Sequence, residues 1–225
     1  MEKYSRLKLL INDKIDNLQN KTVAVIGLGG VGSSAAESLA RCGINNLIIV
    51  DYDTIELSNI NRQLIATEKT IGLKKTDAVE VRINDIDSNI KVLKIDSKLT
   101  LDNLDILFDK KIDYLVDAID DVLVKKEIIR KCIKEKIKSI HVMGTGNKLD
   151  PTRLKIQDVR KTNYDPIAKI IRKMVKEEKI KQKIMVVSSD EEKKVTKYDK
   201  IPSISFVPIV AGNIAVSYIV NDIVK

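Results

Sequence analysis

Residues 27–33 read GLGGVGS, and this glycine-rich stretch constrains the fold more than any other feature of the chain. The apolar run KTVAVIGL (21–28) precedes it, and the helical pattern VGSSAAESLARCG (31–43) follows it. A strand, a G-x-G-x-x-G turn and a helix together place backbone N–H groups where they can bind a phosphate. Asp51 ends the next apolar run (46–53), where a ribose-binding acid belongs. The stretch therefore predicts a nucleotide site, without separating NAD from ATP.

Strand and helix patterns alternate along the first 150 residues. Besides the two apolar runs already named, strand patterns lie at 90–96, 113–120 and 139–144. Helical patterns lie between and after them at 74–87, 101–108 and 122–136. Strands that are apolar throughout are typical of a parallel sheet buried on both faces. We therefore expect an α/β fold: a Rossmann-like, doubly wound, mainly parallel sheet with helices on both faces.

The alternation weakens in the last third of the chain. Patterns there predict an edge strand at 150–162 and a helix opened by proline at 165–179. They also predict a strand with a charged, mobile loop at 183–194, and an apolar strand with a terminal helix at 201–225. We expect residues 1–150 to be a nucleotide-binding core and residues 151–225 an extension that completes the same single domain. The apolar run 204–220 contains Pro208 and Gly212, so we expect a buried helix and no membrane span.

Positive charge is concentrated in one segment. The chain has a net charge of +8, and residues 151–200 hold 15 Lys and Arg against 8 Asp and Glu. Such a segment favours an anionic partner, with nucleic acid as the first candidate. A lysine-rich composition alone also produces basic proteins that have no such partner, so charge leaves both alternatives open.

Cysteine usage and the N-terminus limit the class of protein. The two cysteines, Cys42 and Cys132, form no C-x-x-C pair, which excludes a zinc ribbon and a thioredoxin-like motif. Both lie in helical patterns and are expected to be small core residues. The charged N-terminus lacks a signal peptide, and we expect a cytoplasmic protein.

The cluster that follows Asp51 favours ATP over NAD. A nicotinamide enzyme has no special need for the side chains that follow this acid, which are Asn59, Asn61, Arg62 and Gln63. Arg62 is suited to neutralising phosphate charge while the α-phosphate is attacked. Lys75 is expected to supply a second cation, and Asp120, at the end of the fourth strand pattern, to hold Mg²⁺ between phosphates. The pattern therefore predicts a site that cleaves ATP.

Several motifs resemble one superfamily. They are GLGGVGS, D-x-D at 51–53, N-x-N-R-Q at 59–63, G-L-x-K at 72–75 and D-A-x-D at 117–120. Together they resemble the ThiF/MoeB/E1-like adenylating superfamily, which includes ubiquitin-activating-type enzymes and activators of sulfur-carrier proteins. The resemblance implies ATP and Mg²⁺ as cofactors and an acyl-adenylate intermediate.

The resemblance also implies roles for individual residues. It assigns the nucleotide to Gly27, Gly29, Gly30, Gly32, Asp51, Asp53, Asn59, Asn61, Arg62, Gln63, Lys75 and Asp120, with Asp120 as the Mg²⁺ ligand. The glycines would face the phosphates and Asp51 would hold the ribose. Tyr4-Ser5-Arg6 is similar to the N-terminal Y-S-R of these proteins, so Arg6 is expected to reach the ATP of the partner subunit in a homodimer. Arg62, Lys75, Asp120 and Arg6 are the implied catalytic residues.

Motifs in the second half resemble one branch of the superfamily. These are G-x-x-x-x-x-D-P-T (144–152), D-x-x-K-T (158–162), D-P-x-A-K (165–169), K-I-x-V-V-S-S-x-E (183–191) and S-I-S-F-V-P-x-V-A-G (203–212). They are similar to the tRNA threonylcarbamoyladenosine dehydratase family. The resemblance implies ATP-dependent closure of the threonylcarbamoyl side chain, beside the anticodon, into a hydantoin. The nucleophile belongs to the substrate, which fits the absence of a cysteine after Cys132.

A tRNA partner would explain the basic segment. The candidate contacts to the anticodon-loop region are Arg153, Lys155, Arg160, Lys161, Lys169, Arg172 and Lys173. His141 is expected to be a packed strand residue rather than a general base. Asp121 stands where many members of the superfamily have Asn or Ser, so we expect it to alter the charge beside the Mg²⁺ position. The chain is also shorter than this branch leads us to expect.

Two other functions remain as alternatives. One is an adenylyltransferase that activates the C-terminus of a ubiquitin-like sulfur-carrier protein, and the other is an NAD(P) enzyme or a nucleotide-sensing module. A cysteine desulfurase system is a further candidate partner. Binding of tRNA or of a sulfur carrier, and release of pyrophosphate, discriminate between these functions.

Overall fold

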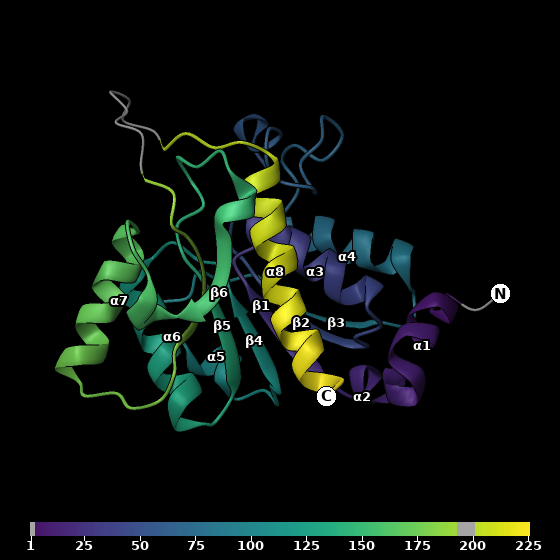
Figure 1. The fold of residues 1–225 in the computed structure, drawn as a ribbon. Coiled ribbons are helices and arrows are strands. Elements are labelled where there is room, and N and C mark those ends of the chain that lie inside the picture. Colours follow the sequence, from purple (N-terminus) through teal and green to yellow (C-terminus); the bar gives the residue numbers. More distant parts are fainter. Residues whose placement is uncertain (1–2, 193–200) are drawn as a thin grey trace.

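A computed structural model describes residues 3–192 and 201–225 (Figure 1). Its strands are β1 (Thr22–Ile26), β2 (Asn46–Val50), β3 (Lys91–Ile95), β4 (Tyr114–Asp117), β5 (Lys138–Val142), β6 (Leu154–Asp158) and β7 (Met185–Ser189). Its α-helices are α1 (Ser5–Ile11), α2 (Ile15–Gln19), α3 (Gly30–Arg41), α4 (Lys75–Ile86), α5 (Asp105–Phe108), α6 (Val122–Lys134), α7 (Pro166–Glu177) and α8 (Phe206–Ile223). Each strand and helix predicted in the first 150 residues is present.

All seven strands form one sheet in the order β3-β2-β1-β4-β5-β7-β6. Every neighbouring pair is parallel except β6–β7, which is antiparallel. The chain builds β1, β2 and β3 toward one edge and then returns to add β4 and β5 on the other side of β1. The predicted doubly wound α/β fold is therefore confirmed, with its switch point between β1 and β4, where such folds bind ligands.

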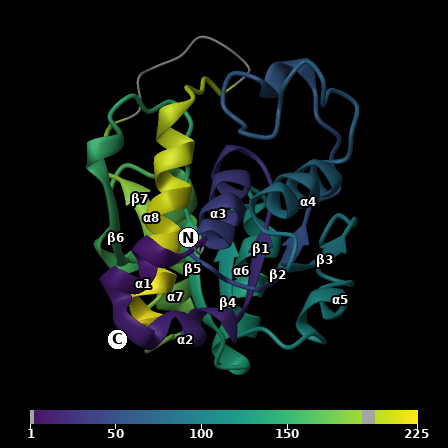
Figure 2. The same ribbon diagram turned by 90° about the vertical axis from the view of Figure 1, so that its right-hand side faces the viewer.

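Alternating side chains of the strands face two layers of helices. Val23 and Val25 of β1 pack with α3, α4 and α8, and Ala24 and Ile26 pack with α5 and α6 on the other face. A third apolar cluster joins α6, α7 and β7. Figures 1 and 2 show α8 lying beside α3 along one face, with α5 and α6 behind the sheet. Burial on both faces explains why the strands read as continuous apolar runs.

The terminal helix is a core helix. Val207, Ala211, Ala215 and Ile219 of α8 are fully buried, and Gly212 lets the helix approach α3 so closely that a Cβ there would overlap the carbonyl oxygen of Val31. By length and composition, α8 is one helix in the described chain that is apolar enough to cross a membrane. Its packing against α3 and the sheet matches the buried helix that the sequence predicts.

Two sequence expectations fail outside the core. The apolar strand expected after residue 201 is wrong, because residues 201–205 form no strand and α8 begins directly after them. Pro202 has no N–H to give a strand, and Ile201 is 78% exposed. The sequence also missed α1 and α2, which are too short for a clear helical period. Part of the loop expected in 183–194 lies outside the described residues.

Candidate active site

A cavity of about 760 Å³ lies at the carboxyl ends of β1, β2, β4 and β5. Its wall includes the glycine-rich turn, the segment after β2, the segment after β4 and the start of α8. That volume is in the range of protein sites for small molecules and cofactors. The cavity is therefore located at the switch point, where the sequence places the nucleotide.

The glycine-rich turn approaches its neighbours too closely for side chains. Gly27 has a φ of +81°, in the left-handed region, and a Cβ on Gly30 would lie 2.8 Å from the carbonyl oxygen of Arg62. A Cβ on Gly29 would meet only the Gln63 amide, at 3.9 Å, so this residue faces open space. Gly32 instead packs directly on the carbonyl of Gly27 and does not line the cavity. This packing seats α3 against the turn, and a contact between the backbone of Gly32 and the phosphates stays a prediction.

Asp51 holds the turn in place. One carboxylate oxygen accepts the N–H of Leu28 at 2.6 Å, and the other accepts the N–H of Asp53 at 2.9 Å. Asp51 is 8% exposed and lines the cavity. A carboxylate has about four acceptor positions, so these two bonds leave capacity for the hydroxyl groups of a ribose.

The segment after β2 folds back over the glycine-rich turn (Figure 2). Its base is closed by the backbone pairing of Thr54 with Lys74. Asn59, which is 7% exposed, shares a reciprocal capping box with Glu56 and so shapes the turn that carries Arg62. The Asn59 side chain therefore has a structural partner, whereas its position still lines the cavity.

Arg62 is an unpaired cation at the cavity wall. Its guanidinium donates to the carbonyl of Ser58 and to the side chain of Asn61, both at 2.9 Å, and meets no carboxylate among the described residues. Asn61 also donates to the carbonyl of Ser203 at 3.1 Å, which ties this segment to the approach to α8. Asn61 itself does not line the cavity. Arg62 thus retains the charge and the donors that a phosphate needs.

Gln63 is 6% exposed and lines the cavity. Its side-chain carbonyl oxygen is buried and has no hydrogen-bond partner within the described part of the chain. A buried polar atom without a partner costs free energy unless a ligand or water satisfies it.

Lys75 and Asp53 form an ion pair of 2.7 Å beside the cavity. The Lys75 side chain is 8% exposed and the Asp53 side chain 45% exposed. Lys75 is the first residue of α4, and its N–H also bonds to the carbonyl of Asp53 at 3.0 Å. An ammonium has three donors, so the pair leaves Lys75 able to contact a phosphate as well.

Four carboxylates that line the cavity lie near Tyr52. The pKa of the Tyr52 phenol is raised above its ordinary value, chiefly by the negative charge of Asp53 and next by burial. Smaller contributions come from the charges of Asp120, Asp51 and Asp121. Asp120 is exposed and makes no hydrogen bond or ion pair with other described residues. Mg²⁺ usually takes one or two carboxylates together with substrate phosphates. Asp120 fits that requirement, although no cluster of three or more acidic, His or Cys side chains that could hold a metal occurs in the described ranges.

Asp121 caps α6 by accepting the N–H groups of Leu123 and Val124 at 3.0 and 3.2 Å. Asp, Asn and Ser are interchangeable at this helix position. The structure therefore gives Asp121 a capping role, which Asn or Ser could also fill.

A buried charged network lies directly beneath this edge. Lys125 and Asp117 are both fully buried and form an ion pair of 2.8 Å, and Asp117 also bonds His141 at 2.8 Å. Lys125 donates in addition to the carbonyl of Val142 at 3.2 Å, and Asp117 accepts the N–H of Ile119. The network joins the ends of β4 and β5 to the turn that carries Asp120. The sequence missed Lys125 and Asp117 as a pair.

The same network fixes the protonation of its members. Burial raises the pKa of the Asp117 carboxyl, but Lys125 and His141 outweigh it and leave the pKa below the ordinary value. Burial lowers the pKa of His141, against the pull of Asp117. His141 donates or accepts at Ser139 through its other nitrogen, at 3.0 Å. A buried, neutral and fully bonded His141 agrees with the packed residue that the sequence predicts.

The remaining candidates lie away from the cavity. Cys132 is 2% exposed, and burial raises the pKa of its thiol to about 12; burial also raises the pKa of Cys42. Neither cysteine lines the cavity. Arg6 is exposed on α1 and does not line the cavity of its own chain. Gln63, Lys75 and the loop around Arg62 are brought together, whereas Arg6 is not.

Comparisons with known proteins match this geometry. The ThiF family profile matches residues 2–224. The chain is 39% identical to the tRNA threonylcarbamoyladenosine dehydratase of Bacillus subtilis over 243 residues, covering 100% of this chain and 96% of that protein. It superimposes on the crystal structure of Escherichia coli tRNA N6-threonylcarbamoyladenosine dehydratase in complex with ATP, with a TM-score of 0.92 and 30% identity, over 98% of this chain and 93% of that one. The complex of the same enzyme with AMP gives a TM-score of 0.90 at 31% identity, over 96% and 91%.

Replacing Lys125 tests the buried network. Lys125→Met should lower the free energy of unfolding by about 3–5 kcal/mol, because Asp117 keeps its charge and loses its main partner. Urea denaturation measures this change. Lys126→Met, at the next position on the same helix, should change stability by less than about 0.5 kcal/mol. The double variant Lys125→Met/Asp117→Asn should recover much of the loss. Equal stability of the Lys125 and Lys126 variants would contradict the network's role.

Proposed function

The chain belongs to the ThiF family, and within it to the tRNA threonylcarbamoyladenosine dehydratases, and from this membership we propose how its residues carry out the reaction. The activity is ATP-dependent dehydration of threonylcarbamoyladenosine in tRNA, through an acyl-adenylate. One observation carries the assignment of the site: an unpaired guanidinium, Arg62, and an unpaired carboxylate, Asp120, line one cavity under a glycine-rich turn. A nucleoside triphosphate with its metal ion satisfies both charges.

The reaction has two steps. A carboxylate oxygen of the threonyl group attacks the α-phosphate of ATP, and pyrophosphate leaves. The ureido nitrogen next to the adenine then attacks the activated carbonyl carbon and loses its proton, and AMP leaves with the former carboxylate oxygen. The products are the hydantoin, AMP and pyrophosphate, so the water lost from the substrate is accounted for by cleavage of ATP.

Residues of the chain hold the triphosphate in this scheme. The N-terminus of α3 and the open backbone at Gly29 bind phosphate oxygens, and Asp51 holds the ribose. Arg62 and Lys75 neutralise the charge that moves onto the leaving pyrophosphate. Asp120 would hold Mg²⁺, which supplies charge neutralisation between the phosphates when it is bound. Residues 1–150 and 151–225 act here as a single adenylating domain.

We also propose a homodimer in which Arg6 completes the site of the other protomer. Arg6 does not line its own cavity, and α1, which carries it, has no buried residue. The same helix exposes Leu9 and Leu10 by 85% and 80%. A second copy that covered these leucines would bury apolar surface and bring Arg6 to a new neighbour. We place the protein in the cytoplasm, where ATP and tRNA are both present.

Activation of a sulfur-carrier protein is not favoured. In the members of the superfamily that form a thioester, a cysteine receives the acyl group, and here both thiols are away from the cavity. The proposed cyclisation involves no sulfur chemistry and needs no cysteine desulfurase. Nucleoside mass spectrometry tests the choice: the protein with ATP, Mg²⁺ and modified tRNA should remove one water from threonylcarbamoyladenosine. AMP formation only with a sulfur carrier would establish the alternative.

Replacing Arg62 tests the phosphate role. Arg62→Ala should lower kcat/KM by about 10²–10³-fold, the usual effect of removing one donor to a developing negative charge. Stability should change little, because the side chain bonds only to Ser58 and Asn61. Steady-state pyrophosphate release measures the activity, and Arg41→Ala, an exposed arginine on α3, is the matched control. Normal turnover in a folded Arg62 variant would remove this residue from the site.

Replacing Asp120 tests the metal position. Asp120→Asn keeps the size of the side chain and removes its charge, so the Mg²⁺ concentration at half-maximal activity should rise at least about tenfold. Asp109→Asn, an exposed aspartate after α5, should leave the Mg²⁺ titration unchanged. An unaltered titration for the Asp120 variant would place the metal on other ligands.

Removing both thiols tests for a covalent enzyme intermediate. Cys42→Ala/Cys132→Ala should retain hydantoin formation, because the nucleophile belongs to the substrate. Mass spectrometry of the nucleoside and a thermal melt of the variant check activity and folding together. Complete loss of activity in the folded double variant would require a thioester after all.

A further inference from the structure

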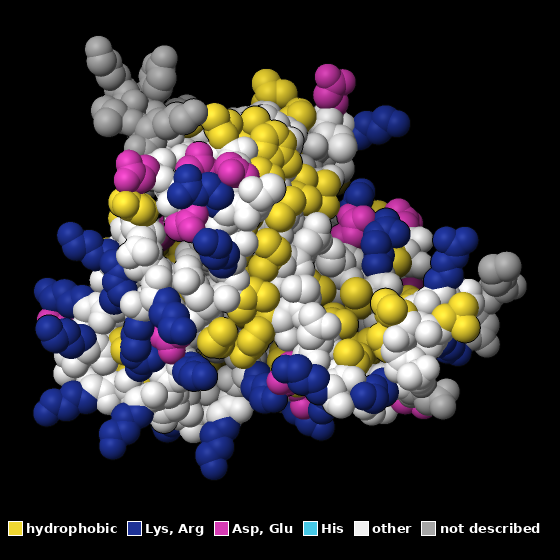
Figure 3. Space-filling model, in the orientation of Figure 1, with side chains coloured by type: hydrophobic (Ala, Val, Ile, Leu, Met, Phe, Trp, Pro, Cys, Tyr) yellow, Lys and Arg dark blue, Asp and Glu magenta, His cyan; other side chains and the backbone are white. Residues whose placement is uncertain are grey.

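Residues 159–183 are strongly positive, with nine Lys and Arg against three Asp and Glu. They run from the residue after β6 through the helix α7 to the segment leading to β7. Figure 3 shows the dark-blue side chains gathered over α7 and along the lower edge of this face. Such a surface attracts anions, but only the cations without internal partners are available to a ligand.

The structure separates paired from unpaired cations. Arg153 and Lys155 both bind Asp190, at 2.7 and 2.6 Å. Arg160 binds Asp158 at 2.8 Å and donates to the backbone carbonyls of Ile180 and Gln182. Arg172 donates to the carbonyl of Thr162 at 2.9 Å. These four side chains hold the local fold together and are poor candidates for contacts with a partner.

Three exposed lysines, which make at most a weak ion pair, form a row on α7. Lys169, Lys173 and Lys176 are exposed at positions i, i+4 and i+7, which lie on one face of a helix. Within the described chain, only Lys173 meets a carboxylate, the exposed Glu177 at 3.7 Å. Such an exposed ion pair contributes little to stability, and another anion can easily replace Glu177 as the partner of Lys173. We refer to Lys169, Lys173 and Lys176 as the lysine stripe.

The lysine stripe begins at the wall of the cavity. Asp165 caps α7 through the N–H of Ala168 at 2.8 Å and also accepts the N–H of Gly144 at 2.9 Å. Gly144 and Ile167 both line the cavity. The twelve residues of α7 span about 18 Å. A chain of phosphates lying along the helix would therefore end at the cavity.

An exposed aromatic stands at the same end. Tyr164, next to the cap Asp165, is 57% exposed. Its φ of 56° lies in the left-handed region, which is unusual for an aromatic residue and is found where surrounding structure or function requires it. Exposed aromatic rings beside lysines are typical of surfaces that bind single-stranded nucleic acid, because every base can stack on them.

We propose that the lysine stripe, with Tyr164 at its cavity end, is the surface on which the substrate RNA docks. Lysines contact the phosphates on one side of the modified nucleotide, and Tyr164 stacks on a neighbouring base while the modified base enters the cavity. Loop nucleotides can be splayed out in this way, whereas paired ones cannot. This inference rests on the proposed function, because only that function makes RNA the partner.

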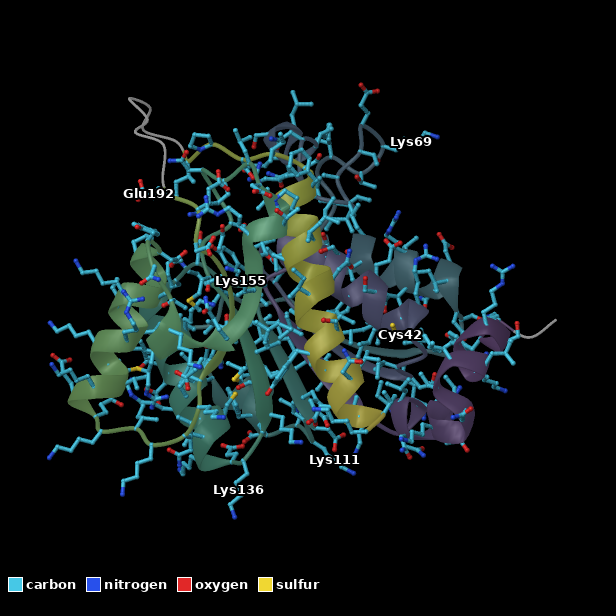
Figure 4. All side chains as sticks on the ribbon, in the orientation of Figure 1. Cys42, Lys69, Lys111, Lys136, Lys155 and Glu192 are labelled. Carbon is cyan, nitrogen blue, oxygen red and sulfur yellow. The ribbon has the colours of Figure 1, made fainter. Side chains whose placement is uncertain are left out.

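A charge-matched pair of triple variants tests the stripe. One variant is Lys169→Gln/Lys173→Gln/Lys176→Gln. The control is Lys110→Gln/Lys111→Gln/Lys136→Gln, which removes the same charge at the amino ends of β4 and β5, opposite the cavity (Lys111 and Lys136 are labelled in Figure 4). Binding of tRNA is measured by fluorescence anisotropy from 50 to 300 mM salt, with ATP binding as a second readout.

The stripe variant should weaken tRNA binding at least about tenfold and reduce the slope of log K against log salt by about 2, as expected for three lost contacts to a single strand. KM for tRNA should rise while kcat at saturating tRNA changes less than about twofold, and ATP affinity should stay unchanged. The control should stay within about twofold of the unsubstituted protein. Equal affinities and slopes for the two triple variants would overturn the proposal.

Tyr164 is tested with a second pair. Tyr164→Leu should weaken tRNA binding about fivefold or more, and Tyr164→Phe should restore it, because stacking needs the ring and not the hydroxyl. Equal binding by the Leu and Phe variants would overturn the stacking role.

The proposed docking surface and the proposed function can be contradicted independently of each other. If the protein dehydrates the nucleoside but the stripe variant binds tRNA normally, the function stands and the docking surface is wrong. If the protein does not dehydrate the nucleoside but binds tRNA through the stripe, the surface stands and the proposed activity is wrong.

Discussion

The bond from the Leu28 N–H to the Asp51 carboxylate, 2.6 Å long and buried, fixes the geometry on which the rest of the site depends. It ties the glycine-rich turn after β1 to the end of β2. The same carboxylate accepts the N–H of Asp53, and Asp53 in turn holds Lys75. One side chain thus sets the distance between the phosphate-binding turn and a phosphate-binding cation. A ribose hydroxyl would join a carboxylate that is already oriented, which lowers the entropic cost of binding.

The charges that line the cavity suit adenylate chemistry. Arg62 and the N-terminus of α3 supply positive charge, and Asp51, Asp53, Asp120 and Asp121, which lie near Tyr52, supply negative charge. These carboxylates would repel a triphosphate alone, whereas a triphosphate with a bound metal ion meets charges of both signs favourably. The buried Lys125 adds a positive charge below the turn that carries Asp120 and keeps Asp117 ionised. Burial of the Lys125–Asp117 ion pair costs desolvation free energy, which is consistent with a requirement for a fixed arrangement beneath the turn that carries Asp120.

Local chemistry decided which parts of this structure were predictable. The glycine-rich turn, the five strands of the first 150 residues and the N-x-N-R-Q segment each carry a signal within a few residues. No such signal marks Lys125, because the sequence VLVKKEIIRK does not show which of its two adjacent lysines is buried. Only the packing of α6 against β4 distinguishes Lys125 from Lys126. The expected strand after residue 201 failed because Pro202 and an exposed Ile201 outweigh the apolar composition.

Residue pairing was likewise invisible in the sequence. Arg153, Lys155, Arg160 and Arg172 read as equal candidates for RNA contacts, and the structure gives each an internal partner. The one carboxylate that binds the first two, Asp190, lies more than 30 positions away along the chain. Lys176, which no sequence pattern singled out, completes the exposed row on α7. Long-range pairing therefore changed the choice of partner surface more than it changed the nucleotide site.

Isotope tracing tests the central claim most directly, namely that the substrate carboxylate attacks the α-phosphate of ATP. Modified tRNA carrying ¹⁸O in the threonyl carboxylate would be incubated with the protein, ATP and Mg²⁺, and the nucleotides and the hydantoin analysed by mass spectrometry. The account predicts that one ¹⁸O appears in AMP for each hydantoin formed. Label in inorganic phosphate with ADP as the product, or hydantoin formed with unlabelled AMP, would contradict it.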